Sequence, residues 1–309
     1  MDKLISVLET ALPVFLALGL GMLCRVTGFL NRDAVDALKK VVINLTLPAV
    51  LLSAFATAEY SASTLVLPFF VYILCCLALA LGYLLLRLCR VKSRLAPFLA
   101  SGFEAGMLGY ALFVLLFRDV SVSKFAILDL GQTLFVFTLF KILLSGKTDW
   151  KAIGTDMVRT PILWAVLAGV LIGATGLFGW MQSAGVSGIL TSATDFISAP
   201  TGMIILLTVG YDLVPREIPW KRTAGLIAMR LLVMAVILGI TVLLNRTVLN
   251  GIIFEWAMVL MVILPPPYVI PVFADEPEER VQISSALSAM TLVTMVLFAV
   301  LSVVIGMQS

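Results

Sequence analysis

The chain has 309 residues, of which 61% are hydrophobic and 13% charged, whereas soluble domains are roughly 45–50% apolar and about 25% charged. A soluble fold of this length could not bury so much apolar surface, so the composition predicts an integral membrane protein. The net charge of +3 is too balanced for nucleic-acid binding, and the lack of histidine excludes His-based triads and His metal sites.

Ten apolar stretches are each long enough, at roughly 20 residues, to cross a bilayer as a helix. Barrel strands alternate in polarity and are about ten residues long, so the spans are expected to be helices. The first stretch has no signal-peptide cleavage pattern before the next span, so we expect it to be retained. The fold class is therefore predicted to be all-α. In chain order the stretches are 4–24, 34–55, 65–88, 95–117, 121–144, 161–180, 186–211, 223–244, 252–274 and 281–305.

The positions of the basic residues predict the orientation. Sixteen of the 21 Lys and Arg residues lie in or beside the loops after the odd-numbered stretches, against four on the other side. The positive-inside rule then places both termini on the non-cytoplasmic side of the cell membrane. The four cysteines lack CxxC spacing and lie in or beside apolar stretches, so we expect no metal site, no disulfide framework and no cofactor.

Proline and glycine recur at corresponding places in the two halves of the chain, which predicts an internal repeat. Because each half has five spans, the second half must enter the membrane inverted. We therefore expect a first repeat at 1–145, a cytoplasmic linker at 146–160 and a second repeat at 161–309. The paired positions are Pro13 and Pro161, Pro48 and Pro200, and Gly102, Gly106 and Gly109 with Pro265, Pro266 and Pro267.

The fourth and ninth stretches are expected to be broken helices. Three consecutive prolines should stop a helix, and broken backbone at membrane depth is tolerated only against protein or a watery cavity. Each restart, near Gly109-Tyr110 and near Tyr268-Val269, would present free amides and a positive dipole end that suit a carboxylate. Inverted halves with broken helices indicate a secondary transporter with its site near midplane. Alternatively, these residues only permit packing or kinks.

Glu104 is the strongest single candidate, since it lies about nine residues, or roughly 13 Å, into the fourth stretch. An ionised carboxylate at that depth is costly, which favours a role in carrying protons or in pairing with a cationic or amine-bearing substrate. A permanently paired structural role is the alternative. Asp129 could serve coupling, gating or structural hydrogen bonding. Arg230 could reach the cytosolic surface or neutralise a carboxylate such as Glu104.

Several segments resemble the auxin efflux carrier family, bacterial branch, of the bile acid/auxin transporter superfamily. They are Phe29-Leu30-Asn31, Asn44-Leu45-Thr46-Leu47-Pro48-Ala49, the glycine-rich segment from Ser101 to Gly109, and Leu264-Pro265-Pro266-Pro267-Tyr268 with the acidic loop that follows. The resemblance implies two inverted five-helix repeats, with helices 4 and 9 crossing at the substrate. It also implies a scaffold of helices 1, 2, 6 and 7 that forms a homodimer, and a moving transport domain of helices 3–5 and 8–10. Family members carry organic anions, including malate and malonate, and typically have asparagine where this chain has Glu104.

The expected function is therefore secondary transport of small organic anions, coupled to protons, by an elevator-like movement. An enzyme is not expected: an intramembrane aspartyl protease needs two facing aspartates, and Asp212 falls at a helix end without a G-x-G-D motif. A cationic or amine-bearing substrate, or a sensor with a transporter fold, remains the alternative. The candidate substrate-binding residues are Asn44, Glu104, Gly106, Gly109, Tyr110, Pro266, Pro267 and Tyr268, and the candidate coupling residues are Glu104, Asp129 and Arg230.

Overall fold

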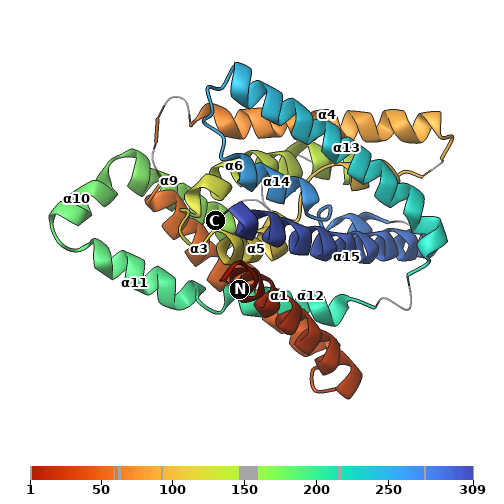
Figure 1. Cartoon of the computed structure of the whole chain (residues 1–309), viewed down its shortest axis with the longest axis horizontal. Coiled ribbons are helices and arrows are strands. Elements are labelled where there is room, and N and C mark those ends of the chain that lie inside the picture. Colours follow the sequence, from red (N-terminus) through yellow and green to blue (C-terminus); the bar gives the residue numbers. More distant parts are fainter. Residues whose placement is uncertain are drawn as a thin grey trace.

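The computed structural model describes residues 2–58, 60–61, 64–91, 93–145, 159–214, 218–274 and 276–308, and every regular element in these ranges is helical (Figure 1). The all-α prediction is thereby confirmed for the described part of the chain. The predicted linker at 146–160 lies outside the described residues except for its last two positions.

The first half contains seven α-helices joined by several irregular turns. Two of the α-helices continue through π-helical turns into the next one, and the fourth apolar stretch is split into a short 3₁₀ segment and a later helix. The elements are α1 (Asp2–Thr27), α2 (Arg32–Val41), a π turn (Val42–Thr46), α3 (Leu47–Ala56), α4 (Val66–Leu88), a 3₁₀ turn (Ala96–Ala100), a π turn (Ala105–Gly109), α5 (Tyr110–Leu116), α6 (Ser123–Phe135), a π turn (Val136–Phe140) and α7 (Lys141–Ser145).

The second half contains two long helices and several shorter ones. Pro161 stands at the first turn of its helix, where a missing N–H costs no hydrogen bond. The ninth apolar stretch is again split. The elements are α9 (Pro161–Ala174), α10 (Leu177–Ser183), α11 (Ser187–Ser198), α12 (Thr201–Asp212), α13 (Trp220–Thr247), α14 (Glu255–Ile263), a 3₁₀ turn (Ile270–Phe273) and α15 (Pro277–Gln308).

By length and composition, six helical segments among the described residues can cross a membrane, or seven if α9 and α10 count as one span. The stretch predicted at 161–180 forms the pair α9–α10, which is bent by 63°. The bend falls at Gly176, whose φ of +75° ends the helix in the left-handed region that favours glycine. The six are Arg32–Ala56, Val66–Leu88, Ser123–Leu144, Ser187–Asp212, Thr223–Thr247 and Pro277–Met307. Ten crossings therefore stay a prediction.

Close helix pairs are built on glycine. In Figure 1, α3 lies beside α9 and α1 beside α12, and both pairs pack along much of their length. A Cβ added to Gly169 would lie 2.8 Å from the Leu52 carbonyl oxygen, and one added to Gly210 would overlap the backbone of Leu18. Small residues let helix backbones approach in this way where lipid gives no hydrophobic drive for association. Helix α4 packs on α6 and α13, and α13 packs on α14 and α15.

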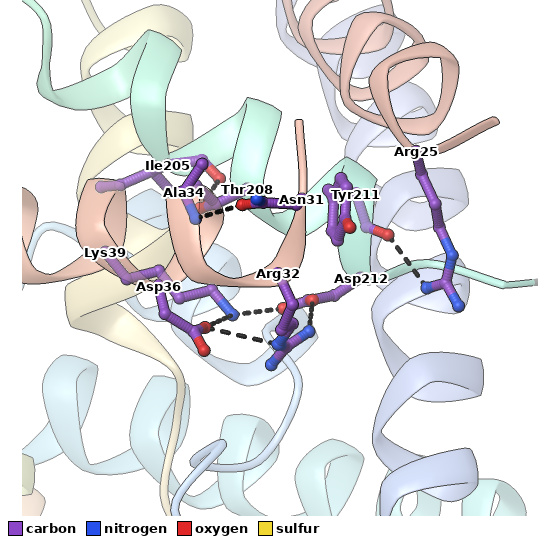
Figure 2. A network of polar contacts seen from close by, with 10 residues as sticks. All are labelled: Arg25, Asn31, Arg32, Ala34, Asp36, Lys39, Ile205, Thr208, Tyr211 and Asp212. Carbon is purple, nitrogen blue, oxygen red and sulfur yellow. Dashed lines mark hydrogen bonds and ion pairs between the residues drawn. The ribbon is translucent and has the colours of Figure 1, made fainter. Parts of the chain in front are cut away.

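Polar contacts gather the loops after the odd-numbered stretches on one face. Figure 2 shows Arg32 and Lys39 of α2 directed at Asp212, the last residue of α12, with nitrogen–oxygen distances of 2.5 Å each. On the same face, the Ser93 hydroxyl donates to Glu279 at 2.9 Å and so joins the start of the fourth stretch to α15. The even-numbered loops meet elsewhere: Arg118, after α5, donates to a backbone carbonyl near the start of α1.

Candidate functional site

The two broken helices meet at their breaks. The Glu104 N–H donates to the Pro265 carbonyl at 2.8 Å, which joins the two extended segments directly. Gly102 has φ of +68°, and a Cβ there would lie 2.9 Å from the Pro267 ring. Only glycine combines that backbone angle with so close an approach. The breaks at 101–104 and 264–269 therefore form one crossing.

Glu104 accepts backbone hydrogen bonds from both sides of this crossing. One carboxylate oxygen accepts from the Met107 N–H at 3.2 Å, and the other accepts from the Tyr268 N–H at 2.7 Å. Glu104 is the N-cap of a π-helical turn that begins at Ala105, and α5 itself begins at Tyr110, where the restart was predicted. The Tyr268 amide, one of those that the sequence assigned to a bound carboxylate, thus binds the chain's own glutamate.

Arg230 binds the opposite helix ends. Its guanidinium donates to the carbonyls of Leu99 and Gly102 at 2.8 and 2.9 Å, and to the carbonyl of Leu264 at 2.8 Å. These carbonyls end the two helical segments that precede the breaks, where helices leave acceptors unsatisfied and favour positive charge. Its side chain is buried, and the guanidinium lies 6.0 Å from the centre of the Phe103 ring. Among the described residues, no carboxylate pairs with it.

Asp129 is buried in α6 beside the crossing, and it is only 6% exposed. One oxygen accepts from the Tyr110 hydroxyl at 2.9 Å, whereas the other has no hydrogen-bond partner among the described residues. Gln132, one turn further along α6, donates its side-chain amide to the Phe103 carbonyl in the break. Helix α6 therefore supports the first break and brings a second acid to it.

A cavity of about 340 Å³ lies against the crossing. Its size falls in the range of small-molecule sites, and like them it is mostly apolar with a few polar groups. The polar lining residues are Glu104, Tyr110, Asp129, Gln132, Thr133 and Tyr268. The apolar lining includes Leu47, Leu51 and Phe55 of the second stretch and Ile162 and Val166 of α9.

The structure brings most of the sequence-predicted residues to this cavity, but not all. Six of them line it: Glu104, Gly106, Tyr110, Asp129, Pro267 and Tyr268. Gly109, Pro266 and Arg230 lie in the crossing without lining the cavity. Asn44 lies away from it, with an exposed side chain that donates to the Lys40 carbonyl of its own helix at 2.8 Å.

Sequence reasoning missed Gln132 and Thr133. Both lie within four residues of Asp129 on the same helix, and such neighbours share a helix face. That spacing was the available signal. The contacts of Arg230 left no signal, because its partners are backbone carbonyls from segments more than 30 residues away.

Comparison with known proteins supports a membrane transporter. No protein-family model matches the chain. Over 212 residues, which are 66% of this chain and 67% of the relative, the sequence is 29% identical to a protein of Methanothermobacter thermautotrophicus named an uncharacterized transporter. Together with the long apolar helices, this similarity decides the class. The chain is a multi-pass membrane protein. The resemblance to the auxin efflux carriers stays a prediction.

Proposed function

We propose that the chain is a secondary active transporter, rather than an enzyme, and that the cavity at the crossing binds its substrate. The observation that carries this proposal is the Glu104 carboxylate, which lies where two broken helices cross and lines the cavity. Broken helices that meet at a shared site near midplane are typical of secondary transporters. An ionised side chain at membrane depth costs free energy. An acid in that position is therefore, by default, taken to mark a functional site.

The pairing of helices supports two inverted repeats of five spans each. Helix α1, the first of the first half, packs on α12 in the seventh stretch, and α9, the first of the second half, packs on α3 in the second stretch. Each half thus places its first span against the later part of the other half's second span. A pseudo-two-fold relation between inverted halves predicts such reciprocal contacts.

The position of the cavity supports an elevator-like movement. Its apolar lining from α3 and α9 belongs to the expected scaffold, whereas Glu104 and Asp129 belong to the expected transport domain. A substrate held by the two acids would therefore move with the transport domain past an apolar scaffold wall. We propose a homodimer through the scaffold, in the cell membrane, with both termini on the non-cytoplasmic side.

We propose that protons drive the transport and that Glu104 is the coupling group, with Asp129 as the second acid of the site. The resemblance to the auxin efflux carriers implies a small organic anion as substrate, so the assay must include acids and amines. Arg230, held by three carbonyls, acts on the crossing rather than as a proton carrier.

The test is uptake by the purified protein in liposomes, with and without an imposed pH gradient, for malonate, malate, a monocarboxylate, an aromatic acid and an amine. We expect saturable uptake of at least one solute that depends on the gradient. Glu104→Gln keeps the side-chain shape but cannot bind or release a proton, so it should abolish the pH-driven component. Asp119→Asn changes an exposed acid outside the cavity and should leave uptake unchanged.

Two results would contradict the proposal. Uptake with unchanged pH dependence in Glu104→Gln would remove the coupling role of this residue. Saturable binding without any flux of the bound solute would favour the sensor alternative.

A further inference from the structure

The anion position at the crossing is already occupied. Helix starts attract carboxylates because their N–H groups and dipoles converge there. Here the Met107 N–H, in the first turn after Glu104, and the Tyr268 N–H, in the other break, donate to the two oxygens of Glu104. A substrate carboxylate would have to displace this one and then lie beside its negative charge.

Asp129 offers an unfilled acceptor at the same cavity. It is more than nine-tenths buried. The Tyr110 hydroxyl donates to one oxygen, the Thr133 hydroxyl also interacts with the carboxylate, and the second oxygen makes no hydrogen bond of ordinary length among the described residues. A buried acceptor without a partner loses the free energy of a hydrogen bond, about 1–3 kcal/mol and more when it is charged. A ligand that brings a donor or a positive charge would recover that loss, whereas a ligand carboxylate would not.

The charges at the crossing do not balance. Two acids, Glu104 and Asp129, line the cavity, and the described lining contains neither lysine nor arginine. Arg230 supplies one positive charge behind the breaks, where it is held by carbonyls. With both acids ionised, one negative charge is left uncompensated. In a low-dielectric site such a charge is stable only with a proton or a cation beside it.

We propose that the substrate class of this cavity is a small organic cation, an ammonium group carried on an apolar body. This inference rests on the proposed transport function and names its substrate class. The ammonium would lie beside Glu104, with the Asp129 carboxylate turned from its buried position toward it, and the apolar body would contact Leu51, Phe55 and Val166. Cation and proton neutralise the same charge, so Glu104 would release its proton to the solution as the cation binds. The transport would therefore be an exchange of cation against proton.

The groups that bear on this exchange are few. The titratable residues that line the cavity with Glu104 are Asp129, Tyr110 and Tyr268, and Arg230 lies behind the crossing. The Tyr110 hydroxyl donates to Asp129, and the Tyr268 hydroxyl lies 2.9 Å from the Thr291 hydroxyl. Of these groups, only the two acids can exchange a bound proton for a bound cation near neutral pH.

The experiment is calorimetric titration of the purified full chain in detergent with benzylammonium and with benzoate, which are similar in size and opposite in charge, and with malonate. We expect benzylammonium to bind saturably and the two anions not to bind. Competition with protons should weaken the apparent affinity tenfold for each pH unit once Glu104 is mostly protonated. Glu104→Gln should weaken binding at least tenfold and reduce this pH dependence, since Asp129 is then the one acid left in the described lining.

Two further variants keep the test sound if Glu104→Gln does not fold. Asp129→Asn, whose size is unchanged, should also weaken benzylammonium binding, whereas Asp119→Asn outside the cavity should bind like the unaltered chain. Binding of benzoate or malonate without benzylammonium, or no benzylammonium binding by folded protein, would overturn the inference. Because binding needs no gradient, this outcome is separate from transport: gradient-driven uptake of malonate would uphold the transporter and refute only the cation.

Discussion

Arg230 and Glu104 bind opposite kinds of backbone group at the crossing. Arg230 donates to carbonyls, and Glu104 accepts from N–H groups. The guanidinium has the planar set of donors needed for three carbonyls at once, which an ammonium group does not reproduce. Arg230→Lys should therefore lose at least one charge-assisted bond, at a cost of about 1.5–3 kcal/mol in the free energy of unfolding. Thermal unfolding in detergent would measure this loss.

The matched control is Arg246→Lys, since Arg246 is 70% exposed and pairs with Glu255 at the surface. Such exposed pairs contribute about 0–1 kcal/mol, so this variant should unfold nearly like the unaltered chain. Equal losses in the two variants would mean that Arg230 does not hold the crossing together.

A site residue can be predicted from the sequence only where the residues around it are of a recognisable type. Glu104, Gly106 and Tyr268 could be found because glycine and proline mark the breaks that place them. Asn44 belongs to a segment that resembles the auxin efflux carriers, but in the π-helical turn there its side chain is exposed. The three carbonyls around Arg230 belong to the backbone, which every residue has, so no residue type could predict these contacts.

At the scale of elements, the close pairing of α1 with α12 depends on Gly210. A Cβ at this position would overlap the backbone of Leu18, which cannot yield as a flexible side chain could. Gly210→Ala should force the two helices apart and lower the free energy of unfolding by about 1–3 kcal/mol. Gly239→Ala, in α13 with open space around it, is the control and should be neutral or slightly stabilising. If both variants unfold alike, the pair is not closely packed.

The positions of the prolines and the hydropathy could predict most elements. A membrane requires the apolar spans of this chain to be helical, and three consecutive prolines must end a helix. Helix α14 does end at Ile263, two residues before the first of the three prolines, Pro265. The bend between α9 and α10 could not be foreseen in the same way. Gly169 and Gly173 of that stretch serve close packing, whereas Gly176 takes the left-handed conformation that turns the chain. Composition does not tell these two uses of glycine apart.

For the whole molecule, the contacts separate two faces, and the basic residues predict which face meets the cytoplasm. Cys89 lies exposed at the end of α4 beside Arg87 and Arg90, whereas Thr247 lies exposed at the end of α13. The positive-inside rule puts Cys89 in the cytoplasm and Thr247 outside. A membrane-impermeant maleimide should therefore label Cys89 only after the cells are permeabilised, in a background with Cys24 and Cys76 changed to serine.

With Cys89 also changed to serine, Thr247→Cys should be labelled in intact cells. Cys75 remains in both backgrounds as an internal control, because it is buried and should not react in the folded protein. Opposite labelling of the two sites requires an odd number of crossings between them, and in the ten-span arrangement five stretches, the fourth to the eighth, lie between Cys89 and Thr247. The same labelling at both sites would contradict that arrangement, and a reversed pattern would keep the spans but place both termini in the cytoplasm.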